Sequence, residues 1–93
     1  MDKKKLIIAR GKIDQLDRRI FDLIKKRTKI VKYMLHLKRH KNQIIDYKRI
    51  GQILQNIKKK SIKNNIDPRI TSRIWKSMIW AYVNYQKRNF KKK

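Results

Sequence analysis

The sequence predicts an all-α protein with three helices, the first of them far longer than the other two. Apolar residues recur every three or four positions from Ile7 to Lys38, a stretch that contains no proline. That spacing is the period of an α-helix, and it continues for about nine turns. Two shorter segments with the same period follow, and the alternating pattern of a half-buried strand is absent.

The length of the first helix indicates that the chain needs a partner. At about 1.5 Å per residue, a helix over residues 6–39 would form a rod of about 48 Å. A compact chain of 93 residues has a radius of gyration of only about 12 Å. Because the rest of the chain cannot cover such a rod, we expect a second copy to pack against it in a homodimer.

The second and third helices have clear start signals. Asp46 is a favourable N-cap, and the apolar residues after it predict a helix over about 46–62. Asp67 and Pro68 place an N-cap before a proline at the first helical position. The third helix is therefore expected over about 68–89.

Polar segments separate the helices and close the chain. Residues 39–43 read as a loop, and residues 61–65 as a break between the second and third helices. We expect one domain over residues 1–93, with disorder at residues 1–5 and 90–93.

Composition excludes several kinds of function. The absence of cysteine rules out disulfides, thiolate metal sites and cysteine nucleophiles. The two histidines, His36 and His40, have no carboxylate cluster beside them, so no metal and no other cofactor is expected. The basic N-terminus contains only a short apolar run, too short for a signal peptide or a membrane span. We therefore expect a cytoplasmic protein with no membrane partner.

The charge invites an anionic partner. The chain has 29 Lys and Arg residues against 6 Asp and Glu, a formal net charge of +23. Nucleic acid, an anionic membrane or a small anion would all be attracted to it. Most lysines, however, are scattered around the helices, and Lys, Ile and Asn are all abundant, as in proteins of AT-rich genomes. No nucleic-acid-binding motif is evident, so nucleic acid is the less favoured partner.

Two basic residues of the first helix are placed to hold a small anion. Arg27 and Lys38 are eleven residues apart, which returns them to within about 20° of one direction at a separation of about 16.5 Å. The gap between their side chains fits an anion with two acidic ends, beside Val31 and Met34. Arg10 lies about 25 Å before Arg27, so only the partner's Arg10 could reach this ligand. Spacing alone thus predicts a helical dimer with a cationic, partly apolar cavity.

Polar residues on the other two helices could face the same cavity. Tyr82 and Gln86 are four residues apart, one above the other, among expected core positions of the third helix. A glutamine in such surroundings either reaches solvent or bonds a group inside. On the second helix, Arg49 follows the Asp46 cap by three residues.

Over about residues 6–88 the chain resembles the AroQ-type chorismate mutases. No single motif is strong, but positions in all three helices keep the family's spacing. These are Arg10, Ile13-Asp14, Leu16-Asp17, Leu23-Ile24, Arg27, Val31, Lys38, Asp46, Arg49, Ile66-Asp67 and the stretch from Ile70 to Gln86. The resemblance implies an intertwined all-helical homodimer, without a cofactor, in which each active site takes Arg10 from the other subunit.

The resemblance also implies roles for the polar residues. Arg27 and the partner's Arg10 would hold the two carboxylates of the substrate. Lys38 would donate to the ether oxygen of the C–O bond that breaks. Gln86 would donate to the same oxygen or to a nearby carboxylate.

The remaining implied site residues come from all three helices. Arg49, with the backbone near Asp46, would shape the side formed by the second helix. The apolar wall would consist of Met34, Ile79 and Val83.

Two departures from the family pattern resemble one of its branches. Typical members have Glu directly after the second-helix Arg, where it bonds the ring hydroxyl of chorismate, but here the residue is Ile50. They commonly have a small polar residue four positions before the Gln, but here it is Tyr82. Both features are similar to the isochorismate-pyruvate lyases, which form salicylate in siderophore pathways.

We therefore expect a lyase that converts isochorismate to salicylate and pyruvate and could retain weak chorismate mutase activity. The first alternative is chorismate mutase itself, which forms prephenate for aromatic amino acid biosynthesis. The second is a basic helical dimer that binds nucleic acid.

Overall fold

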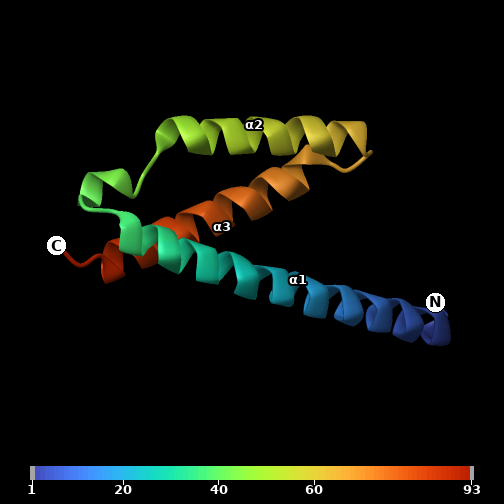
Figure 1. Ribbon diagram of the computed structural model, residues 1–93. Coiled ribbons are helices and arrows are strands. Elements are labelled where there is room, and N and C mark those ends of the chain that lie inside the picture. The colour runs from blue at the N-terminus through green and yellow to red at the C-terminus, as the bar shows by residue number, and fades with distance from the viewer. Residues whose placement is uncertain (1, 93) are drawn as a thin grey trace. The chain divides into compact units, whose positions relative to one another are not determined.

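The computed structural model describes residues 2–92, and Met1 and Lys93 lie outside the described residues. Within residues 2–92 the regular elements are all helical, which confirms the all-α fold class. Figure 1 shows three α-helices and one short 3-10 helix: α1 (Lys3–Leu37), η1 (Lys41–Gln43), α2 (Tyr47–Lys63) and α3 (Pro68–Asn89).

Helices α2 and α3 begin where their caps predicted. The carboxylate of Asp46 accepts a hydrogen bond from the backbone N–H of Arg49 at 3.0 Å. Asp67 accepts one from the backbone N–H of Arg69 at 2.9 Å, with Pro68 in the first turn. Each carboxylate satisfies an amide that has no partner inside its helix.

The expected disorder of residues 1–5 is wrong for Lys3 to Lys5, which form the first turn of α1. The reason is Asp2, whose carboxylate accepts a hydrogen bond from the backbone N–H of Lys5 at 3.1 Å. At the other terminus Phe90 was also expected in a disordered tail. Its side chain is half-buried and packs against the apolar cluster described below.

The chain divides into two units after Tyr33. The first unit contains α1 up to that residue and no other element. Its large apolar side chains are mostly exposed, including Ile13, Leu16, Ile20 and Phe21 at 56%, 50%, 52% and 67%. The described part of this unit therefore has a hydrophobic pattern but no second layer of its own.

The second unit begins at Met34 and is a hairpin of α2 and α3, with the end of α1 and η1 before it (Figure 1). Its core cluster consists of Ile44, Ile79 and Val83, which are 5%, 6% and 4% exposed. Half-buried apolar residues surround the cluster: Leu35, Ile45, Ile50, Ile53, Leu54 and Phe90.

A buried hydroxyl pair joins the other end of the hairpin. Ser61 was expected in a polar break, but α2 continues through Lys63 and Ser61 is only 3% exposed. Its hydroxyl donates to the Ile57 carbonyl at 2.6 Å and lies 2.6 Å from the Thr71 hydroxyl. The Thr71 hydroxyl also lies 3.4 Å from the Pro68 carbonyl, and either hydroxyl can be the donor between Ser61 and Thr71. The pair fixes α2 against α3 beside the turn.

Candidate active site

The second unit brings together the two residues to which the sequence assigned catalysis. Lys38 directly follows α1, and its backbone N–H donates to the Leu35 carbonyl at 3.1 Å. Gln86 lies near the end of α3 and is 7% exposed. The Nζ of Lys38 donates to Oε1 of Gln86 at 2.7 Å. The sequence predicts Lys38 at the substrate ether oxygen and Gln86 at that oxygen or a nearby carboxylate, but it does not predict their direct bond.

The amide of Gln86 is held at both ends. Its Nε2 donates to the backbone carbonyl of Tyr82 at 3.3 Å, one helical turn earlier. This bond directs Oε1 toward the Lys38 ammonium, where a charge-assisted hydrogen bond forms. The Lys38 ammonium has three N–H donors. It could therefore donate to a ligand oxygen in place of Oε1, or to a ligand oxygen and Oε1 together.

The surroundings of Lys38 alter its acidity. Burial lowers the pKa of its ammonium below the ordinary lysine value, because a partly apolar environment disfavours the charged form. The carboxylate of Asp46 opposes this shift with a smaller effect. Lys38 is thus a cation whose local solvation is reduced, which strengthens its attraction for an oxygen that gains negative charge.

Apolar residues lie below the Lys38–Gln86 pair along α3. Val83 and Ile79 precede Gln86 by three and seven residues, and so share its face of the helix. Both belong to the core cluster and have little exposed surface to offer a ligand. Met34, the third expected wall residue, is 48% exposed.

Helix α2 contributes Arg49 and Ile50 on successive positions. Arg49 is exposed, and its backbone N–H is held by the Asp46 cap. Ile50 is half-buried and packs against the core cluster, so an aliphatic side chain occupies this part of the hairpin. On α3, Tyr82 is also half-buried.

The two arginines expected to bind the substrate carboxylates lie in the first unit. Arg10 and Arg27 are both on α1, and Arg10 is exposed. The second unit therefore contains the lysine, the glutamine and the α2 residues of the expected site, but neither of these arginines.

Residues 2–92 contain neither a metal-site cluster nor a membrane-spanning helix. No group of three or more His, Asp or Glu side chains in this range could hold a metal ion. None of its helices combines the length and the apolar character that a bilayer crossing requires.

The family model for chorismate mutase type II matches residues 9–87. The chain therefore belongs to the chorismate mutase type II family. Membership supports a pericyclic enzyme of the chorismate mutase type, acting on a chorismate-type substrate. No curated protein and no solved structure shows significant similarity to the chain.

Proposed function

We propose that this protein is an isochorismate-pyruvate lyase, which converts isochorismate to salicylate and pyruvate. The observation that carries the proposal is Ile50, an aliphatic residue packed on the core cluster directly after Arg49. A buried carboxylate aimed at the ring hydroxyl of chorismate would be badly placed for isochorismate, whose hydroxyl is on another carbon. An unsatisfied buried acceptor costs about 1–3 kcal/mol, and Ile50 avoids that cost.

Lys38 would supply the main stabilisation of the transition state. In the lyase reaction a ring hydrogen moves to the methylene carbon of the enolpyruvyl group while the ether C–O bond breaks. Pyruvate leaves and the ring becomes aromatic. Negative charge grows on the ether oxygen, so an ammonium already oriented by Gln86 can stabilise it without further reorganisation.

The substrate carboxylates would be clamped by Arg27 and by the partner's Arg10 in a homodimer. Support for the dimer comes from the exposed apolar side chains of α1 and from the small core of the second unit. A chain of this size gains much by burying such a helix in a second copy. The dimer would also supply the partner's Arg10 to the proposed site.

Chorismate mutase activity is the second candidate. The family match and the Lys38–Gln86 pair favour it equally, because the rearrangement of chorismate to prephenate also places charge on the ether oxygen. Only Ile50 and Tyr82 separate the two proposals.

Assays of the full chain on both substrates test the choice. Salicylate fluorescence would follow the lyase reaction, and loss of chorismate absorbance would follow the mutase reaction. We expect a larger kcat/KM for isochorismate. A larger kcat/KM for chorismate would overturn the lyase assignment and leave the mutase.

Substitution at Ile50 tests the proposed source of this preference. Ile50→Glu should shift the ratio of kcat/KM values toward chorismate by about 5- to 150-fold, the equivalent of 1–3 kcal/mol. The ratio is taken within one variant, so a loss of stability cancels. Ile50→Leu is the matched control and should keep the wild-type ratio. An unchanged ratio in Ile50→Glu would remove this residue from the account.

A further inference from the structure

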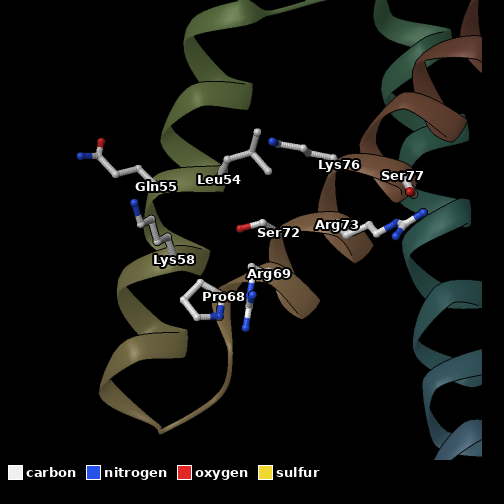
Figure 2. Close-up of a pocket in the computed structure, with 9 residues that line it drawn as sticks. All are labelled: Leu54, Gln55, Lys58, Pro68, Arg69, Ser72, Arg73, Lys76 and Ser77. Carbon is white, nitrogen blue, oxygen red and sulfur yellow. The ribbon is translucent and has the colours of Figure 1, made fainter.

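A basic groove lies between the C-terminal half of α2 and the N-terminal half of α3 (Figure 2). Its volume is about 820 Å³. The charged residues that line it are all cations, and two serines lie among them. These six residues are Lys58, Arg69, Ser72, Arg73, Lys76 and Ser77.

Three of the four cations have no carboxylate partner. Arg69 is bound to Asp67, with its Nε and Nη2 3.1 and 2.9 Å from Oδ2. In the described part of the chain the other ion pair is Asp2 with Lys5, outside the groove. The charges of Lys58, Arg73 and Lys76 are therefore not neutralised by an acidic side chain.

The cations are presented from two helices. Lys58 comes from α2 and Lys76 from α3. In Figure 2 the ammonium of Lys58 points away from α3, at the outer edge of the groove. Figure 2 shows Ser72 and Lys76 pointing from α3 toward α2, while Arg73 points away and extends the positive surface. The Ser61–Thr71 hydroxyl pair holds the two helices together close by.

The groove is separate from the Lys38–Gln86 pair. Lys76 precedes Gln86 by ten residues on α3, a distance of about 15 Å along the helix. One small dicarboxylate could not span it, and charges beyond about 8 Å are screened at physiological salt. Three further lysines on the last turns of α2 are also exposed: Lys59, Lys60 and Lys63.

We propose that this groove binds the phosphodiester backbone of a nucleic acid without reading its sequence. Leu54, Gln55 and Pro68 also line this open groove. Its cations and hydroxyls suit a row of phosphates, since lysine acts as a point charge and serine as a neutral donor. No aromatic side chain lines the groove, so it offers no platform for base stacking. Such binding requires none of the reading motifs that the sequence lacks.

The test measures binding of a fluorescein-labelled oligothymidylate of about 20 nucleotides to the full chain by anisotropy at several salt concentrations. The groove variant carries Lys58→Gln, Arg73→Gln and Lys76→Gln. The control variant carries Lys25→Gln, Lys29→Gln and Lys32→Gln, three exposed lysines of α1, and has the same net charge.

We expect the groove variant to bind at least tenfold more weakly than wild type at about 100 mM salt. The slope of log K against log salt concentration should fall by about 2, because each lost phosphate contact on a single strand contributes about 0.7. The control should change affinity less than threefold. Turnover by the groove variant should match wild type, because none of its substituted residues belongs to the proposed active site.

Two results would overturn the proposal. Equal losses in the groove and control variants would assign binding to net charge alone. A wild-type Kd weaker than about 10⁻⁴ M at physiological salt would fall outside even non-specific binding. The single variants Lys58→Gln and Lys76→Gln, each expected to remove about a third of the slope change, give a second reading if the triple variant does not fold.

Discussion

The two units of the chain use similar hydrophobic patterns in different ways. In the second unit the pattern is satisfied internally, because Ile44, Ile79 and Val83 bury one another between η1, α2 and α3. In the first unit it runs along a single helix whose Leu16 and Ile20 are about half exposed, at 50% and 52%. The contrast indicates that the apolar face of α1 packs against a surface outside the first unit.

The contrast extends to chemistry. The second unit holds the paired groups that would act on the breaking bond, Lys38 and Gln86, at 2.7 Å. The first unit holds the arginines that would orient the substrate, Arg10 and Arg27. Fully burying a Leu or Ile side chain contributes about 1.5–3 kcal/mol, so several such residues on α1 can offset the cost of association.

The largest effect is expected from removing the ammonium of the second unit. Lys38→Ala should lower turnover at least a hundredfold, since losing one donor to a developing oxyanion costs about 3–4 kcal/mol of barrier. The protein should stay folded and dimeric, as judged by circular dichroism and sedimentation. Lys48→Ala removes an exposed lysine of α2 and should keep wild-type turnover. Near wild-type turnover in Lys38→Ala would contradict the catalytic role assigned to Lys38.

The internal core of the second unit is tested by Ile44→Ala. Ile44 is 5% exposed, and truncating a buried Ile to Ala lowers the free energy of unfolding by about 2–5 kcal/mol. Urea denaturation at high protein concentration measures this loss. Tyr47→Ala, at a position 72% exposed, should change it by less than about 0.5 kcal/mol. Similar losses in the two variants would contradict the described core.

The opposite test places a charge on the exposed face of the first unit. Leu16→Glu should raise the dimer dissociation constant at least tenfold, because the partner's surface would then meet a carboxylate. Gln15→Glu adds the same charge at a polar position of α1 and should have a smaller effect. Analytical ultracentrifugation over a range of concentrations distinguishes them. Equal dissociation constants would show that Leu16 is not at an interface.

The smallest expected effect is on the pH dependence of activity, which tests whether Lys38 acts as an ammonium. Burial favours the neutral amine, so Lys38 loses its proton at a lower pH than an ordinary lysine. Because the mechanism requires the ammonium, kcat/KM should hold through neutral pH and fall in an alkaline limb that begins below the usual lysine range. An arginine stays protonated, so Lys38→Arg should lack that limb in whatever activity remains. The same limb in both proteins would exclude Lys38 as its source.

Local chemistry explains what the sequence could predict of the fold. The starts of α2 and α3 follow from Asp46, Asp67 and Pro68, whose effects depend only on their immediate neighbours. Helix α1 starts at Lys3, earlier than the apolar pattern predicts, because the Asp2 carboxylate accepts a hydrogen bond from the backbone N–H of Lys5. The burial of Ser61 could not be predicted, since it depends on Thr71 in another helix.

The candidate site shows the same division. Helical spacing and the family resemblance predicted that Lys38 and Gln86 are functional residues of the site. Their mutual hydrogen bond joins residues 48 positions apart, and no spacing within one helix specifies it. The placement of Ile79 and Val83 in the core cluster likewise depends on how Ile44 packs before α2.

In the proposed dimer one active site combines Lys38 of one copy with the partner's Arg10. Mixed dimers test this arrangement directly. Lys38→Ala and Arg10→Ala homodimers should each be nearly inactive. When the two variants are unfolded together and refolded as a mixture, half of the dimers are hybrids, and each hybrid contains one intact site. If each site is shared in this way, the mixture should recover about a quarter of wild-type activity. A mixture that stays as inactive as its two components, although hybrids form, would contradict it.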